Sequence, residues 1–554
     1  MASLTPHNGP LGTRLAAHLL RRTSFGPTRT EIDSIAAMTA DQAVDLIMQI
    51  PPLPEDPVDP ETGLTWFPQG RTTANSENED LKMIINSWWL YQVMKPSLAP
   101  TVAHKLFFFL HTCFPTGFLD IEWNENFYYT LRLFMAYLEG SYKELAFKIC
   151  LDNGMNDYLD IGDSVAGNPN ENFVREFMEL YTIGKGPSAG EGDYTTFTEQ
   201  DVIEAARLLT GFRRNDDWDN PLYLDPLTNL PQARLDVSKH DDTDKVFSPR
   251  FQDQVIVGQN TEAGMLVELQ QFVDMIFNQP AAAEYLMRKL YRFFLRYTIS
   301  AEVENDIILP LAQTFRTQNY ELIPVLKQLF KSQHFYDADD SDSEDEVIGA
   351  LIKNPLEMQL GMMRYFQVAI PDPANDLFHA YVTFFNYGIQ KLQSEACFDL
   401  FAPPEVAGYQ PIYQAPEYNR LWISAKSIPS RYAIVDELLE GPDHLLIDVM
   451  GFVNDPTNIP DFQGMDILGN PGPHPGARIP IHLLENLLPY LLPEALPAAR
   501  LDYFYTEVLL DNLPEEDWLY EWDDYVASGD DTNVKSVLKR LIRAILQSPE
   551  YQLG

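Results

Sequence analysis

The sequence has few cysteines and no long apolar run, and both scarcities limit what the chain can be. Its 554 residues include three cysteines, Cys113, Cys150 and Cys397. They lie far apart, and an odd number cannot complete a set of disulfides, so we expect three small buried apolar residues. The lack of any CxxC pair excludes a zinc ribbon or a thioredoxin-type centre. Apolar stretches such as 106–110 are too short to cross a bilayer, so the sequence predicts no membrane span.

The N-terminus also lacks the pattern of a signal peptide. Residues 1–26 contain no basic segment followed by an apolar run of the required length. We therefore expect a chain that is soluble as written. Its cellular location stays open, because a removed export signal is compatible with this sequence.

Positive charge is scarce. The chain has 39 Lys and Arg residues against 81 Asp and Glu residues, which gives a formal net charge of −42. A surface of this sign repels polyanions, so we expect no nucleic-acid partner. The same charge disfavours docking on an anionic membrane face. Hydrophobic residues make up 45% of the chain, which is enough for a packed core.

Several common catalytic signatures are missing. The sequence contains no GxxxxGK[ST] and no HExxH motif, and no GxGxxG in a βαβ setting. Their absence disfavours the common P-loop NTPases, zincins and Rossmann dehydrogenases.

The fold class follows from helical periodicity. Apolar residues recur three to four positions apart along most of the chain, and Pro- and Gly-rich stretches interrupt them. We predict a mainly α protein: a large multi-helix, bundle-like domain with irregular Pro/Gly-rich insertions and at most a small β-hairpin. Its successive parts, expected to form one continuous domain, are 1–150, 151–260, 261–400, 401–480 and 481–554.

The densest group of ionisable side chains lies in residues 169–183, where the spacing predicts a helix beginning near Pro169. Glu171 and Glu179 each lie four residues from Arg175, and Glu176 lies three residues before Glu179, so all can share one side. Two carboxylates one turn apart can bind a divalent cation or divide acid and base roles. The alternative is structural, with the arginine bridging two glutamates.

Two histidines are further candidates. His111 ends the apolar segment 104–111, where it is either a ligand or catalytic group or a buried, hydrogen-bonded histidine. His240 precedes Asp241, and a histidine beside an aspartate can act as an oriented base or a metal ligand. An ordinary turn explains the second pair equally well.

Aromatic residues gather in the Pro- and Gly-rich segment 401–422. Tyr409 and Trp422 could form a wall on which sugar rings stack. The alternative is that they close the core beneath a loop.

Seven separated blocks carry a family resemblance. In order they are HLLRRTSFGPT (18–28), PNENFVREFMELYTIG (169–184), YTTFTEQDVIEAARLLTGF (194–212), KHDDTDK (239–245), RKLYRFF (288–294), FAPPEVAGY (401–409) and SPEYQ (548–552). With these blocks the chain resembles the large bacterial family called domain of unknown function 1800, from about His18 to its end.

The resemblance implies little about the reaction, because the family has none that can be carried over. Members are often exported, and their genes commonly lie beside those of a sulfatase-like family, which implies work on extracellular polymers and a sulfatase-like partner protein. The family's two most typical blocks match Asn170, Glu171, Asn172, Arg175, Glu176 and Glu179, and then His240 and Asp241. This chain departs at 110–113, where relatives tend to read Trp-His-x-His. Cys113 replaces the second histidine, so a metal site built on that pair is in doubt here.

We favour, narrowly, an enzyme: a hydrolase or other modifier of extracellular polysaccharide. The expected catalytic residues, converging on one hollow, are Glu176, Glu179, His111, His240 and Asp241. The expected binding residues are Asn170, Glu171, Asn172, Arg175, Tyr409 and Trp422. A divalent cation is the cofactor that such a site would take. Two alternatives stay open: a non-catalytic scaffold or assembly component, and a metal-dependent oxidoreductase, which the lack of a Glu-x-x-His pair weakens.

Overall fold

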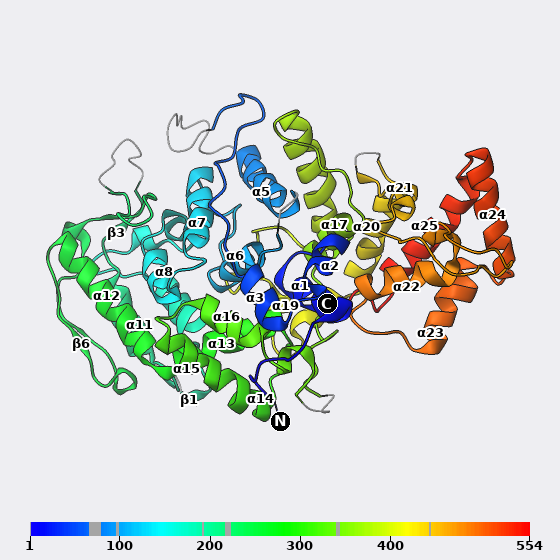
Figure 1. Cartoon of the computed structure of the whole chain (residues 1–554). Helices are drawn as coiled ribbons and strands as arrows, with labels where there is room; N and C mark the ends of the chain where they lie inside the picture. Colours follow the sequence, from blue (N-terminus) through cyan, green and yellow to red (C-terminus); the bar gives the residue numbers. More distant parts are fainter. Residues whose placement is uncertain are drawn as a thin grey trace.

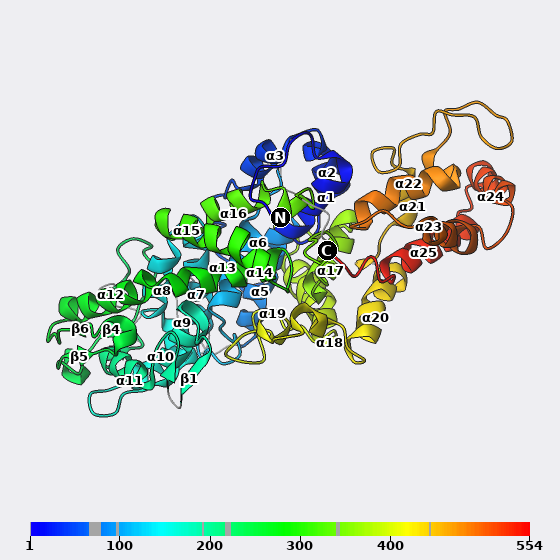
Figure 2. The same ribbon diagram turned by 90° about the horizontal axis from the view of Figure 1, so that it is seen from below.

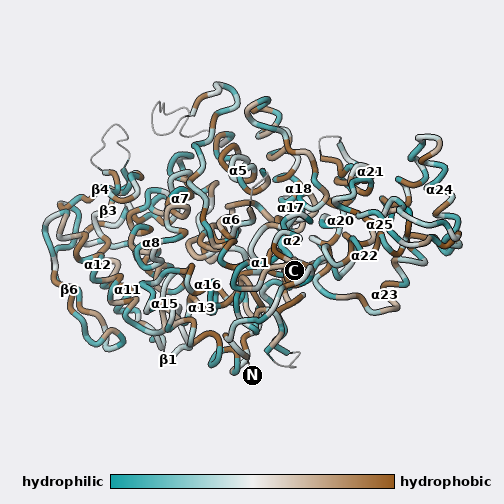
Figure 3. The backbone as a smooth tube through the Cα atoms, in the orientation of Figure 1, coloured by the Kyte–Doolittle hydropathy of each residue, from teal (hydrophilic) through white to brown (hydrophobic). Residues whose placement is uncertain are grey.

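Helices dominate the computed structural model, which confirms the predicted fold class, and they pack into an elongated body (Figure 1). The structure describes residues 2–65, 79–95, 99–190, 193–215, 223–339, 344–442 and 445–554. Polar and apolar residues alternate along most helices (Figure 3), as expected for helices with one buried face. Among the described residues, none of the helices combines the length and apolarity needed to cross a membrane.

The first part of the chain forms the middle and one end of this body. Its helices are α1 (Gly12–Thr23), α2 (Arg29–Ala36), α3 (Ala40–Ile47), α5 (Glu79–Met94), α6 (Ala103–Cys113), α7 (Asn124–Ala136), α8 (Tyr142–Ile149), α9 (Asn153–Tyr158), α10 (Asn172–Glu176), the π-helix η2 (Phe177–Thr182) and α11 (Glu199–Leu208). Helix α11 begins with a capping box, in which Thr198 and Asp201 exchange main-chain and side-chain hydrogen bonds.

The strands are short. Among the described residues they make three antiparallel pairs: β1 (Ser188–Gly190) with β2 (Asp193–Tyr194), β3 (Phe212–Arg213) with β4 (Arg234–Leu235), and β5 (Lys245–Val246) with β6 (Val255–Ile256). Two of these pairs lie within 211–260, where the sequence predicts an irregular insertion.

The later helices complete the body and its far end. They are α12 (Glu262–Asn278), α13 (Pro280–Phe294), α14 (Ala301–Val303), α15 (Leu309–Thr317), α16 (Leu322–Phe330), α17 (Pro355–Tyr365), the π-helix η8 (His379–Gln390), α18 (Lys391–Glu395), α19 (Gln410–Tyr413), the 3-10 helix η9 (Tyr418–Trp422), α20 (Ser427–Glu440), α21 (Val449–Asn454), α22 (Pro480–Leu491), α23 (Ala498–Asp502), α24 (Glu515–Ser528) and α25 (Thr532–Leu546). Helices α22 to α25 lie at one end, and the chain then returns to the centre beside α17 (Figures 1 and 2).

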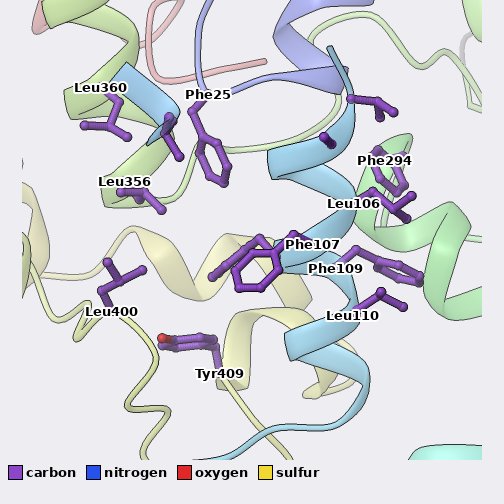
Figure 4. Packing of buried hydrophobic residues seen from close by; sticks show 14 of the residues in the cluster. Phe25, Leu106, Phe107, Phe109, Leu110, Phe294, Leu356, Leu360, Leu400 and Tyr409 are labelled. Atoms are coloured by element: carbon purple, nitrogen blue, oxygen red, sulfur yellow. The ribbon is translucent and has the colours of Figure 1, made fainter. Parts of the chain in front are cut away.

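Helix α6 lies at the centre of the core. Nearly all of its side chains are buried, and Figure 4 shows it among side chains from distant segments, including Phe25, Leu356 and Tyr409. The ring of Phe25 lies edge-on to that of Trp89, with centroids 5.6 Å apart. Such aromatic pairs add about 0.5–1.5 kcal/mol each beyond the area that they bury. Two ionisable side chains of α6, Lys105 and His111, are buried in this core.

Two sequence predictions need correction. Helix α10 begins at Asn172 and not near Pro169. The side chain of Asn170 accepts a hydrogen bond from the Asn172 N–H, a local turn that delays the helix. The prediction that all three cysteines are buried is wrong for Cys397, which is exposed. It occupies the left-handed backbone region (φ 65°), in a tight turn after α18.

Candidate functional site: a buried cationic cavity

The predicted carboxylate pair stands where α10 passes into a π-helix. Glu176 ends α10, and Glu179 lies in η2. Burial, followed by the charge of Glu179, raises the pKa of the half-buried Glu176 carboxyl. Glu179 forms an ion pair with Lys185, whose Nζ lies 3.1 Å from both carboxylate oxygens. A single turn of π-helix inside an α-helix is frequent at functional sites.

Arg175 does not bridge Glu171 and Glu179. It donates two hydrogen bonds of 2.7 Å to Glu199 on α11 and one of 3.2 Å to Glu171. The wider turn of the π-helix moves Glu179 off the expected row, so it pairs with Lys185 instead. The ion pairs of Arg175 are partly exposed and join α10 to α11.

His240 belongs to a buried network that joins the irregular insertion to α12. Its Nδ1 lies 2.8 Å from the carbonyl oxygen of Thr210, and its Nε2 lies 3.1 Å from Oε1 of Glu268. Both partners accept hydrogen bonds from the ring or lie within hydrogen-bond distance of it. Lys245 donates to the other oxygen of Glu268 at 2.6 Å. The carboxylate of Glu268 thus lies between His240 and Lys245.

Asp241 pairs with Arg207, whereas the adjacent His240 contacts Glu268. Burial alone would raise the pKa of Asp241, but hydrogen bonds from Arg207 and Thr243 together lower it to about 2. Its Oδ2 lies 2.9 Å from Nε of Arg207 on α11.

The side chain of Asn170 donates a hydrogen bond to the carbonyl oxygen of Asp160, which fixes the turn before α10.

His111 lies deep in the core. Its Nε2 lies 3.2 Å from the carbonyl oxygen of Thr116, and its ring contacts those of Phe108, Phe134 and Phe401. Burial lowers the pKa of His111 to about 4, so the ring is neutral at neutral pH.

The structure brings some of the predicted residues together and leaves others apart. Glu176 and Glu179 are neighbours, but within the described part of the chain no hydrogen bond or ion pair links either to His111 or His240. Among the described residues, no group of three or more His, Cys, Asp or Glu side chains is arranged to hold a metal ion. A catalytic role for these four residues stays a prediction.

The two predicted aromatic residues lie near a cavity. Tyr409 is buried, stacks on Phe398 with ring centroids 5.0 Å apart, and donates to the carbonyl oxygen of Asp399. Trp422 is nearly buried and lines a cavity of about 80 Å³ in the middle of the molecule. Its other lining residues come from α1, α6, α13, α17, α19, α22, the C-terminal segment and the intervening loops.

This cavity is strongly cationic. Five of its lining side chains are positive, and Glu357 is the one carboxylate among its lining side chains, all of which lie in described segments. The five are Arg21, Arg22, Lys105, Arg292 and Lys353. In the whole chain, by contrast, acidic residues outnumber basic ones by 81 to 39.

The cations crowd one another. Burial lowers the pKa of Arg21 and of Arg22 to about 9, and the charge of Arg22 further lowers that of Arg21. Burial, Arg21, Arg431 and Arg22, in that order, hold the pKa of Lys353 well below its ordinary value. A guanidinium keeps its proton under physiological conditions. The two arginines therefore keep their positive charge in the cavity wall.

Several donors in the cavity wall lack partners in the protein. Nε and Nη1 of Arg21 and Nε of Arg22 are buried without a hydrogen-bond acceptor. The amide nitrogen and the amide oxygen of Asn419 are also buried without a hydrogen-bond partner. Arg21 is 9% exposed and Arg22 4%. The Nη2 of Arg21 donates to the carbonyl oxygen of Leu492, and the Nη2 of Arg22 donates to that of Val347. Unpaired buried donors on a cation are costly, so they point to an absent ligand.

Remote segments build the cavity. After α1 the chain turns at Gly26, whose φ of 99° and close approach to Gly361 of α17 leave no room for a side chain. The C-terminal residues run beside the start of α17, where the N–H of Lys353 donates to the carbonyl oxygen of Gln552. The Nζ of Lys353 lies 2.7 Å from the carbonyl oxygen of Tyr551 and over its ring.

Sequence reasoning missed these cations, although a signal was present. Arg21 and Arg22 end a helix whose other late residues are apolar, and Lys105 stands among phenylalanines. A cation at a position that helical periodicity assigns to the core needs a buried partner. Three of the blocks that carry the family resemblance, 18–28, 288–294 and 548–552, contribute to the cavity wall.

Comparison with known proteins gives one match. A family model described as "Protein of unknown function (DUF1800)" matches residues 18–553, nearly the whole chain. No curated protein and no solved structure matches.

Proposed function

The chain belongs to the DUF1800 family of proteins of unknown function, and we propose that it binds a compact anionic ligand in the cationic cavity. One observation carries the proposal: five cationic side chains and one carboxylate side chain line the same cavity, inside a protein with a formal charge of −42.

The energetic argument concerns uncompensated charge. Leaving a buried charge without a partner costs about 3–5 kcal/mol. Arg21 and Arg22 together offer three unpaired donor atoms, and Asn419 adds an unpaired amide. An oxyanion would accept hydrogen bonds from these donors and offset the repulsion among the cations.

The size of the cavity and the charge of the surface limit the ligand. At roughly 10–15 Å³ for each water-sized unit, a space of about 80 Å³ holds about six such units. This suits a phosphate, a sulfate or a small carboxylic acid. The net charge of −42 repels long polyanions, so the ligand is a small molecule or one terminal group of a polymer.

Calorimetric titration tests this proposal. Sodium sulfate, phosphate and citrate are titrated at constant ionic strength, with sodium chloride as the reference salt. We expect saturable binding of at least one oxyanion, and a loss of about tenfold or more in affinity for Arg21→Gln, because a hydrogen bond to a charged group contributes about 1.5–3 kcal/mol. Arg420→Gln is the matched control, since that side chain is 59% exposed. Equal heats for wild type and Arg21→Gln, or no saturable binding, would contradict the proposal.

A second candidate function is modification of a polysaccharide, and the carboxylate pair supports it. The raised pKa of Glu176, beside Glu179 at the start of a π-helix, suits a general acid working next to a second carboxylate. No described contact yet identifies a sugar subsite beside the pair.

This candidate is tested with glutamine variants. Purified protein is assayed for release of reducing ends from neutral and sulfated polysaccharides. Glu176→Gln and Glu179→Gln should abolish turnover with little change in thermal midpoint, since both side chains are partly exposed. Retained turnover with a large loss of stability would assign the pair a structural role.

A further inference from the structure

We propose that Lys105 is a nucleophilic amine that forms an imine with a small carbonyl compound bearing an anionic group, such as a 2-oxo acid. The inference rests on the proposed anion-binding function, because the neighbouring cations would hold the anionic end of the same ligand. It adds a covalent step that anion binding alone does not require.

The surroundings of Lys105 are apolar on two sides. The side chain is 3% exposed and lines the cavity from α6. Its Nζ lies 5.0 Å from the ring centroid of Phe25 and 5.5 Å from that of Phe293. Burial and the charge of Arg22 together hold the pKa of Lys105 well below its ordinary value. A lysine desolvated in an apolar pocket beside another cation is the arrangement that activates amines for imine chemistry.

Glu357 is fixed in contact with that amine. Its Oε1 accepts a hydrogen bond from the Lys105 ammonium, while its Oε2 accepts one of 3.0 Å from the N–H of Asn354. The N–H of Glu357 donates in return to the Asn354 side chain, which completes the capping box at the start of α17. The carboxylate therefore cannot swing away, and it can take and return the proton of the amine.

The same cavity holds groups suited to both ends of such a ligand. Arg21, Arg22 and Lys353 supply positive charge for a carboxylate, and Asn419 supplies an unpaired amide. A three-carbon 2-oxo acid has six non-hydrogen atoms, which agrees with the room for about six water-sized units in about 80 Å³.

The step balances without a co-reactant. The ammonium of Lys105 passes a proton to Glu357, and the free amine nitrogen adds to the carbonyl carbon. The carbonyl oxygen takes up the proton from Glu357 and then the second amine proton, and it leaves as water. The products are a protonated imine and one water molecule, so the charge of one is conserved.

Reductive trapping on the full-length protein tests the inference. The protein is incubated with pyruvate and sodium cyanoborohydride, digested, and mapped by peptide mass spectrometry. We expect the reduced adduct to form faster on Lys105 than on the exposed Lys239, since a lowered pKa leaves more of the amine unprotonated. Sulfate should slow labelling of Lys105 and leave that of Lys239 unchanged.

Variants separate this inference from the anion-binding function. Lys105→Arg keeps the positive charge and should lose the adduct; Lys426→Arg, a control at an exposed lysine outside the cavity, should keep it. If wild type binds sulfate but Lys105 is labelled no faster than Lys239, the amine inference fails and anion binding stands. If sulfate does not bind, both fail. The wild-type mapping with sulfate competition decides the matter even where a variant does not fold.

Discussion

Buried ionisable side chains in this protein fall into two groups, according to whether the chain supplies their counter-charge. His240 and Lys245 share the carboxylate of Glu268, so that network is complete within the protein. Arg22 has the negative charge of Asp337 nearby, but both arginines donate to main-chain carbonyl oxygens, and some of their donors have no partner. The first group stabilises the fold, and the second leaves donors free for a ligand.

The burial of His111 makes the stability of the fold depend on pH. The folded pKa of His111 is about 4, below the ordinary 6.5, so between these values the unfolded chain binds a proton that the folded chain does not. The contribution of His111 to the free energy of unfolding is therefore complete above pH 6.5. It is lost as the pH falls toward 4, by up to about 3 kcal/mol. His111→Gln should reduce this pH-dependent loss, measured by urea unfolding at a series of pH values. Identical pH profiles for both proteins would show that the folded chain admits the proton.

The affinity for an anion should also depend on pH. Lys353 has a pKa held well below its ordinary value, and a bound anion favours its protonated form. Binding therefore takes up protons, and the dissociation constant should rise with pH, by at most about tenfold per unit for each proton. Titrations in buffers with different heats of ionisation measure this uptake directly. Proton release on binding would contradict the assignment.

At the scale of elements, ion pairs of very different burial join neighbouring helices. Glu268 is 1% exposed and links α12 to the insertion through His240 and Lys245. Glu199 is 38% exposed and links α11 to α10 through Arg175. The first pairing is sensitive to loss of one partner, whereas the second is screened by solvent.

A matched pair of variants tests that difference. Glu268→Gln leaves the buried ammonium of Lys245 without a counter-charge and should lower the free energy of unfolding by about 3–5 kcal/mol. Glu199→Gln, its control, should cost at most about 1 kcal/mol. Urea unfolding measures both. Similar losses in the free energy of unfolding for the two variants would show that burial does not determine how much these ion pairs stabilise the fold.

Helical periodicity in the sequence predicts the elements well but not their junctions. The capping box at Thr198 is local, so its residues alone predict it. The change from α10 to a π-helix is not local, and it redirects Glu179 from Arg175 to Lys185. For the same reason a spacing argument places Glu176 beside Glu179 but cannot tell which distant segment covers them.

At the scale of the whole molecule, the cavity depends on the return of the C-terminal segment to the centre. The ammonium of Lys353 donates a hydrogen bond to the carbonyl oxygen of Tyr551 and lies over its ring. The N–H of Gly554 donates a hydrogen bond to the carbonyl oxygen of Leu351. These residues are about 200 positions apart in the chain. No local pattern could predict their meeting, which explains why sequence reasoning named Trp422 but not the cations beside it.

Truncation tests this long-range closure. Removal of residues 551–554 takes away the acceptor for Lys353 and part of the cavity wall. The shortened protein should lose anion binding and unfold at a lower temperature, as followed by calorimetric titration and scanning calorimetry. Replacement of Leu553 by Ala, which leaves the chain in place, should retain binding. Undiminished binding after truncation would contradict a cavity closed by this segment.

The central claim is that an anion occupies the buried cationic cavity. The most direct measurement is a crystal structure with selenate, a sulfate analogue whose selenium is located by anomalous scattering. The account predicts a selenium peak inside the cavity, with oxygens within hydrogen-bond distance of Arg21, Arg22 or Lys353, and loss of that peak in crystals of Arg21→Gln. Selenate found only at surface arginines, with an empty cavity, would contradict it.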